Sequence, residues 1–195
     1  MTREHLESFR GKSIPDLVGP GMRLLFVGIN PGLWTAATGA PFARPGNRFW
    51  PALAEAGITE HLVDASAGMT DADRAHLIAR GVGITNLVAR ATNRADELSA
   101  DEFREGAQRL ERNVAAWRPA VVAVAGITAY RLGFGRPRAV SGRQPEDLGG
   151  AQLWVVPNPS RLNAHATPAS LAAAYREPAE AAGVVRPPPV VEVRP

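Results

Sequence analysis

Short apolar runs that end at turn residues are the feature of this sequence that most restricts its fold. Runs of this kind, which are typical of buried strands, lie at 23–29, 83–88, 120–125 and 153–156. Segments with helical spacing or capping signals separate them, at 48–56, 71–80, 99–117, 128–132 and 168–176. Because strands alternate with helices, we predict an α/β fold: a three-layer αβα domain with a mainly parallel central sheet of four to five strands.

Shifts in composition divide the 195-residue chain into three parts. Residues 1–20 resemble an arm with a short amphipathic stretch, 21–180 form the predicted domain, and 181–195 are a proline-rich tail that we expect to be disordered. No apolar run reaches the length of a membrane span. Since the segment from Met1 to Glu7 is charged from the start and unlike a signal peptide, we expect a cytoplasmic protein.

The cysteine and histidine content narrows the chemistry. The chain has no cysteine, which excludes disulfides, thiol nucleophiles, iron–sulfur clusters and cysteine zinc sites. Its four histidines show no metal-ligand spacing, so we expect neither a metal nor another cofactor. The formal charge of +3 is almost all arginine, since Lys12 is the only lysine. Genomic bias and phosphate binding both explain that arginine content, and the charge alone does not separate them.

Three segments carry candidate chemistry: 28–32 (GINPG), 39–50 (GAPFARPGNRFW) and 157–160 (PNPS). The first and last place an Asn-Pro pair at the end of a predicted strand: Asn30-Pro31 after 23–29 and Asn158-Pro159 after 153–156. In open α/β sheets, ligands bind beyond the carboxyl ends of the strands, so this placement predicts a site there. Each segment alone has an ordinary structural explanation, because Asn-Pro is common in turns and aromatic residues are common in cores.

Together and in this order, the three segments resemble the family of mismatch-specific uracil-DNA glycosylases and thymine-DNA glycosylases. The resemblance covers about 21–177, and 98–106 (LSADEFREG) is also similar to a helix start of the vertebrate thymine glycosylases. It implies an enzyme that flips uracil, and thymine or damaged pyrimidines, out of mismatched double-stranded DNA and hydrolyses the N-glycosidic bond. We expect a monomer that uses no cofactor and does not associate with a membrane. The lack of cysteine separates the chain from the iron–sulfur uracil glycosylases, which need four.

The resemblance implies that Asn30 holds the water that attacks the sugar. An asparagine cannot take a proton at neutral pH, so Asn30 would orient the water rather than act as a base. The alternative is that Asn30 only caps a turn. Phe42 resembles the aromatic residue that stacks on the flipped base, with the backbone amides of Ile29 and Phe42 donating to base oxygens. Phe42 could instead be a core aromatic.

Further pocket residues follow from the same resemblance. Asn86 would lie near the base edge, although a solvated strand-end asparagine is an alternative. Thr35 falls where the family has a small residue close to base C5, so its branched side chain is expected to restrict thymine. Asn158 is expected to bound the pocket. Asp96 is a separate candidate, an acid after the second strand that could assist catalysis, and no family motif supports it.

The DNA contacts are expected in the segment Ser160, Arg161, Leu162 and Asn163. Leu162 resembles the wedge that fills the gap left by a flipped base. It could instead be a loop leucine that packs inward. Arg161 stands where bacterial relatives usually have glycine, and Ala164 stands where relatives carry arginine, so the contact to the opposite guanine is open. A lesion-binding module with little turnover remains a second function. A nucleotide-binding fold is disfavoured, since the chain lacks the Gly-x-Gly-x-x-Gly loop.

Overall fold

The computed structural model describes residues 1–164 and 166–186 and contains one five-stranded sheet with the strand order β2-β1-β3-β5-β4. Its strands are β1 (Leu24–Gly28), β2 (Val82–Asn86), β3 (Val121–Ala125), β4 (Gly142–Leu148) and β5 (Ala151–Val156). All neighbouring pairs are parallel except β4 and β5. The predicted fold class, an α/β domain with a mainly parallel sheet, is therefore confirmed.

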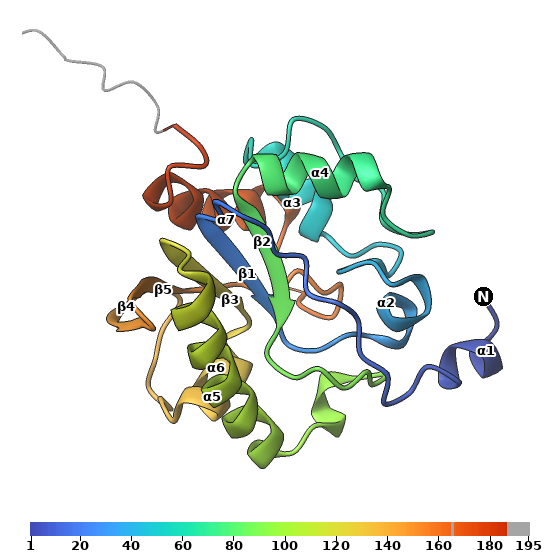
Figure 1. Ribbon diagram of the computed structural model, residues 1–195. Helices are drawn as coiled ribbons and strands as arrows, with labels where there is room; N and C mark the ends of the chain where they lie inside the picture. Colours follow the sequence, from blue (N-terminus) through green and yellow to red (C-terminus); the bar gives the residue numbers. More distant parts are fainter. Residues whose placement is uncertain (165, 187–195) are drawn as a thin grey trace, which may run out of the picture.

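Helices cover both faces of the sheet, as Figure 1 shows. The helices are α1 (Arg3–Glu7), α2 (Leu33–Thr38), α3 (Phe49–Glu55), α4 (Asp71–Ala79), α5 (Ala100–Trp117), α6 (Ile127–Phe134) and α7 (Pro168–Ala181). The first face packs against α3, α4 and α7, and the second packs against α5 and α6. The sheet is thus the middle of three layers.

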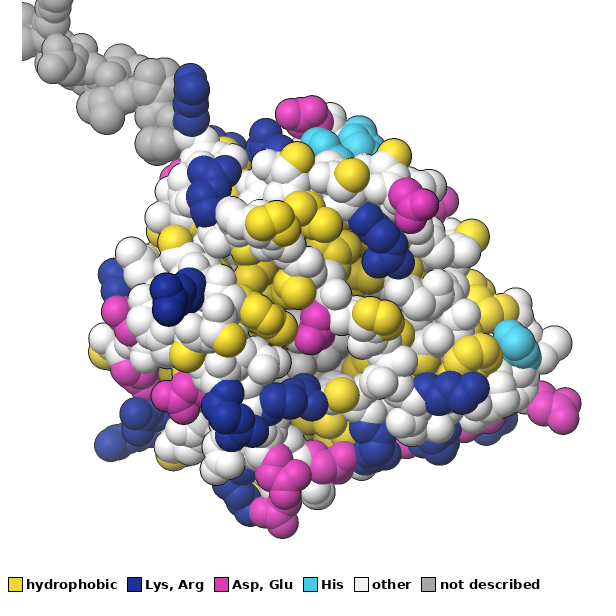
Figure 2. All heavy atoms as spheres, in the orientation of Figure 1, with side chains coloured by type: hydrophobic (Ala, Val, Ile, Leu, Met, Phe, Trp, Pro, Cys, Tyr) yellow, Lys and Arg dark blue, Asp and Glu magenta, His cyan; other side chains and the backbone are white. Residues whose placement is uncertain are grey.

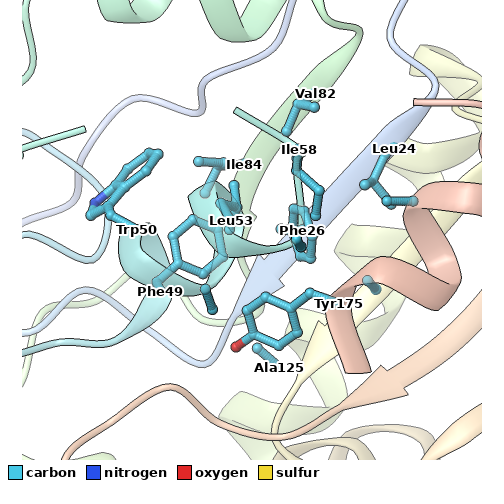
Figure 3. Close-up of a cluster of buried hydrophobic side chains, with 14 of the residues drawn as sticks. Leu24, Phe26, Phe49, Trp50, Leu53, Ile58, Val82, Ile84, Ala125 and Tyr175 are labelled. Atoms are coloured by element: carbon cyan, nitrogen blue, oxygen red, sulfur yellow. The ribbon is translucent and has the colours of Figure 1, made fainter. Parts of the chain in front are cut away.

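Strand β1 is buried on both faces because alternate side chains point to opposite sides. Leu24 and Phe26 join one core, and Leu25 and Val27 join the other. Phe26 packs against Phe49 of α3 and Tyr175 of α7, with ring centroids 5.3 and 5.4 Å apart (Figure 3). These contacts fix α3, which begins at the end of the 39–50 segment, and α7, which follows the 157–160 segment.

The predicted helices and strands do not include α1, α2 or β4. Helix α2 lies where no element was predicted, and its Gly32 N-cap supplies no side-chain hydrogen bond that would mark its start. Strand β4 is an antiparallel edge strand that contains Pro145 and alternates buried with exposed residues. The other predicted strands and helices are present, and their ends shift by a few residues.

Buried residues extend beyond both ends of the 21–180 range. Leu17, assigned to the arm, is 5% exposed and pairs with Ile84 beside β2. At the other end, Ala182 and Val184 are buried against the core, so the packed domain continues beyond 180. The rest of the predicted disordered tail, 187–195, lies outside the described residues.

The charged side chains on the face shown in Figure 2 are dispersed. Arginine and lysine side chains are interspersed with acidic ones there, and no large patch of one sign is visible. Within 1–164 and 166–186, no helix is both long and apolar enough to cross a lipid bilayer.

Candidate functional site

A cavity of about 380 Å³ opens at the carboxyl ends of the parallel strands. Residues at the ends of β2 and β3 and just after β1, β2 and β5 line it, together with residues of α2 and of the 39–50 segment. Asparagines are prominent in the lining: Asn30, Asn47, Asn86, Asn93, Asn158 and Asn163. The predicted site residues Ile29, Thr35, Phe42, Ser160 and Leu162 also line it. A volume of this size is in the usual range for small-molecule sites.

Asn30 is held by the loop that follows β2. Its Nδ2 donates to the carbonyls of Pro31 at 3.2 Å and Arg90 at 2.9 Å, and to the Thr92 hydroxyl at 2.8 Å. Carbonyl oxygens only accept hydrogen bonds, so these partners fix which way the Asn30 amide faces. Its Oδ1 is therefore the group that can accept a hydrogen bond from a ligand in the cavity.

Phe42 is positioned by an aromatic stack and by a glycine. Its ring stacks on Phe49, with centroids 3.8 Å apart and planes 17° apart, which leaves its other face for the cavity. A Cβ on Gly28 would lie 2.7 Å from the Asn86 Oδ1 and 3.1 Å from the Phe42 ring. Only glycine therefore lets both side chains lie against the end of β1.

The backbone of Phe42 is also unusual, because its φ is +54°. A side chain in this left-handed region costs about 1 kcal/mol, and such conformations concentrate at functional sites. The two alternatives for Phe42, a base-stacking aromatic and a core aromatic, are compatible in this structure. The ring packs on the core at Phe49 and still lines the cavity.

Thr35 and Asn158 lie on different walls of the cavity. Thr35 is on α2 and is 6% exposed, so its methyl and hydroxyl groups are fixed against the lining. The Asn158 Oδ1 accepts from the Ser160 backbone amide at 2.9 Å. The Tyr175 hydroxyl donates to the neighbouring Pro157 carbonyl at 2.9 Å, and burial raises the pKa of Tyr175, so that hydroxyl stays protonated.

The loop after β5 carries the predicted wedge, and we call 158–164 the wedge loop. Leu162 is 77% exposed yet lines the cavity mouth, so it does not pack inward as an ordinary loop leucine would. Arg161 is exposed and its side chain lies against Gly46. A Cβ added to Gly46 would lie 2.6 Å from the Arg161 Cδ. Arg161 borders a second hollow beside the cavity, with Arg44 and Leu162.

The cavity lining holds cations and no carboxylate among the described residues. Arg44 and Arg94, which lack a sequence signal that would predict them, are exposed and line the cavity. Asp96 is not in the lining. Its side chain is 62% exposed and pairs with Arg94 at 2.7 Å, so the geometry gives no support to Asp96 as a catalytic acid. In the described part of the chain, no group of three or more histidines or acids could hold a metal ion.

The loop at 90–97 is braced from two directions. Arg90 pairs with Glu102 of α5 at 2.7 Å, and this pair together with the Ser99 backbone amide lowers the pKa of Glu102 to about 2. From the N-terminal side, the Gly11 amide donates to the Ala91 carbonyl at 2.9 Å, and Arg10 pairs with Glu97. The arm therefore supports the loop that holds Asn30, a role that no local sequence signal revealed.

Comparison with known proteins agrees with this architecture. Residues 15–178 match the family model described as the uracil DNA glycosylase superfamily. The fold is similar to a solution NMR structure of a candidate uracil DNA glycosylase from Methanosarcina acetivorans, with a TM-score of 0.56. That match has 15% sequence identity and covers 86% of this chain and 97% of the other. At this identity, the structural match supports the fold alone.

Proposed function

Since this chain belongs to the uracil DNA glycosylase superfamily, and is thus a DNA glycosylase, we propose that it removes uracil from mismatched double-stranded DNA. The observation that carries this proposal is the orientation of Asn30. Its NH₂ group is bound by three acceptors, and its Oδ1 is left for a water in an amide-rich cavity. The abasic site that remains would be the product, with free uracil as the leaving base.

The proposed chemistry is hydrolysis through a sugar cation. As the bond from deoxyribose C1′ to the base nitrogen breaks, positive charge develops on the sugar and negative charge on the base. Asn30 accepts a hydrogen bond from a water and holds the water oxygen towards C1′. A bond from this oxygen to C1′ replaces the broken bond to the base nitrogen, and the proton that the water loses passes through solvent to neutralise the departing base. Because no carboxylate lines the cavity in the described chain, the attack depends on the electrophilic sugar and a good leaving group. This favours uracil and damaged pyrimidines over normal bases.

The extruded base would lie against the cavity face of Phe42. Phe49 fixes the opposite face of that ring, so stacking would require little rearrangement. The backbone amides of Ile29 and Phe42 would stabilise the developing charge on base oxygens. Asn86 would read the base edge, because its amide offers a donor and an acceptor. Thr35 would disfavour the thymine methyl group, since its branched side chain is held in the wall.

Three arginines around the mouth suit the DNA backbone. Arg44 and Arg94 line the cavity, and Arg161 lies beside it, so phosphates on either side of a flipped nucleotide could be bound. Asp96 then has a role outside catalysis, as the partner of the Arg94 guanidinium. Leu162 at the mouth would fill the gap in the base stack.

The experiment that tests the proposal measures base release from duplexes containing G·U, A·U or G·T, and from single-stranded uracil DNA. Alkali cleavage of the abasic product gives the rate. We expect release in excess of the enzyme concentration, fastest with G·U. The variant N30A should lose at least about 100-fold in single-turnover rate while keeping its affinity for a non-cleavable analogue.

The matched control is N113A, which removes an amide from α5 outside the cavity lining. Equal losses in both variants would remove Asn30 from the mechanism. Equal rates on G·U and A·U would refute mismatch preference. Tight binding of the mismatch without release beyond one base per protein would favour the lesion-binding module instead.

A further inference from the structure

Arg48 makes an unusual set of contacts with the wedge loop. It lies at the N-cap of α3, and its guanidinium is directed at backbone carbonyls far along the chain. Nη2 donates to the Asn163 carbonyl at 2.9 Å and also to the Ser160 carbonyl. Nη1 donates to the Ala166 carbonyl, and Nε to the Pro159 carbonyl at 3.4 Å. The backbone amide of Arg48 also donates to the Pro159 carbonyl, at 3.2 Å.

These contacts join both ends of the wedge loop to one rigid group. A guanidinium is planar and has five donors in a fixed arrangement, so it can hold several carbonyls at once where a lysine ammonium cannot. Pro159 and Ser160 lie before Leu162, while Asn163 and Ala166 lie after it. No carboxylate forms an ion pair with Arg48 among the described residues, so its charge is directed at the loop.

The loop's other hydrogen bonds are short-range. Ser160 donates to Asn158, Leu162 donates to the Ser160 hydroxyl at 3.3 Å, and Asn163 donates to the Ser160 and Asn158 carbonyls. Such bonds shape the turn, but they do not fix its position relative to the cavity. Arg48 supplies that connection, because α3 is anchored in the core through Phe49.

We propose that Arg48 is a positioning residue that holds the wedge loop ready for insertion into the base stack. The inference rests on the proposed function, since it takes Leu162 as the wedge. An exposed leucine on a mobile loop would lose conformational entropy each time it entered the duplex. A loop held in advance by Arg48 avoids much of that cost, which matters most where the base is hardest to extrude.

Arg80 provides a matched control within the same chain. Its guanidinium also donates to backbone carbonyls, those of Gly57 at 2.9 Å, Ile58 at 3.1 Å and Val184 at 3.3 Å. None of these groups lines the cavity. Loss of either arginine should therefore lower stability through unsatisfied carbonyls, but only Arg48 should affect base extrusion.

The test compares R48M, R48K and R80M with the unmodified protein. Single-turnover rates are measured on a G·U duplex and on a duplex with uracil in an unpaired bubble. R48M should lose about tenfold more rate on the G·U duplex than on the bubble, because extrusion is cheap in the bubble. R80M should show the same rate ratio as the unmodified protein. The rate ratio of R48K should be closer to that of R48M than to that of the unmodified protein, since one ammonium cannot replace the several donors of the planar guanidinium.

Two further measurements separate positioning from general stability. Hydrogen exchange of peptides covering 158–164 should speed up in R48M and not in R80M. The rate losses of R48M and L162A on the G·U duplex should not add, because both act through one loop. Equal losses on both substrates, or unchanged exchange in the loop, would overturn the inference. If the unmodified protein released no base from any substrate, the proposed function would fail, while the exchange result would still decide whether Arg48 holds the loop.

Discussion

The side-chain amide of Asn30 donates to the hydroxyl of Thr92 at 2.8 Å, and that hydroxyl donates onward to the Arg94 carbonyl at 2.7 Å. Thr92 is 1% exposed, so its side chain is held in place by the surrounding residues. These hydrogen bonds connect Asn30, at the end of β1, to the 90–97 loop. Asn93 and Arg94 of this loop line the cavity. Thr92 therefore helps to set the direction in which the Asn30 Oδ1 points.

Replacement of Thr92 should test that orientation. T92V keeps the side-chain shape and removes the hydroxyl, so one of the three acceptors of the Asn30 amide is lost. We expect a single-turnover rate about tenfold lower, with DNA affinity nearly unchanged. T92S, which keeps the hydroxyl, should stay close to the original rate.

The matched control for this prediction is T59V. Thr59 is also buried, but its hydroxyl has no hydrogen-bond partner among the described residues. Its replacement should leave the rate unchanged. If T92V and T59V behaved alike, the hydroxyl of Thr92 would have no role in positioning Asn30.

Leu162 should matter in proportion to the difficulty of base extrusion. L162A removes the apolar group that would fill the gap in the stack, so activity should fall most on A·U, less on G·U and least on single-stranded uracil. Single-turnover rates on the three substrates measure this order. L62A removes another exposed leucine, 62% exposed and outside the cavity lining, and should change none of them. Equal losses of L162A on all three would exclude a wedge.

The protein should not cut the DNA strand. Strand cleavage by a glycosylase proceeds through a Schiff base between an amine and the sugar. Lys12, the only lysine, lies with its Nζ 4.7 Å from the centre of the Phe9 ring and is not part of the cavity lining. Borohydride should therefore trap no covalent adduct with DNA. Any trapped adduct would refute this prediction, and its loss in K12R would identify Lys12 as the amine.

Glu102 should make stability depend on pH at the acidic end. Arg90 and the Ser99 backbone amide lower the pKa of Glu102 to about 2 in the folded protein, below the ordinary value of 4.5. A lowered pKa means that the charged form stabilises the fold. This contribution is complete above about pH 4.5 and is lost as the pH falls towards 2.

Urea unfolding of E102Q checks this expectation. At pH 7 the variant should be less stable by about 1 kcal/mol, because it weakens a helix cap and a partly exposed ion pair. The difference should shrink as the pH falls below 4.5, the ordinary value for a glutamate. E105Q, at an exposed position of the same helix, is the control. A difference that stayed constant down to pH 2 would show that charge is not the cause.

The sequence predicted those elements whose signals are local. Strands β1 and β3 are continuous apolar runs because helices cover both of their faces, and the Ser99 cap of α5 is visible as a pattern. Strand β4 gave no such signal, since an edge strand needs one buried face only and tolerates Pro145. Helix α2 is short and has no polar cap.

The same distinction applies to the site. Residues in the motifs at strand ends, such as Asn30 and Asn158, could be predicted because parallel strands bring their carboxyl ends to one edge. Thr92 and Arg48 could not, because their partners lie 62 and more than 100 positions away in the sequence. Only the folded chain brings the Thr92 hydroxyl to the Asn30 amide and the Arg48 guanidinium to the backbone of the wedge loop.

The pairing of Leu17 with Ile84 also bears on self-association. Strand β2 is at one border of the sheet, and the Leu17 and Ile84 backbones exchange hydrogen bonds of 2.9 and 2.8 Å across it. An uncovered border strand presents free N–H and C=O groups on which a second molecule can add a strand. A fragment beginning at Gly21 would expose such a template, whereas β4 at the opposite border carries a proline and several charges that discourage addition. The N-terminal segment thus covers the Ile84 backbone at this border, and we expect its removal to favour association between molecules.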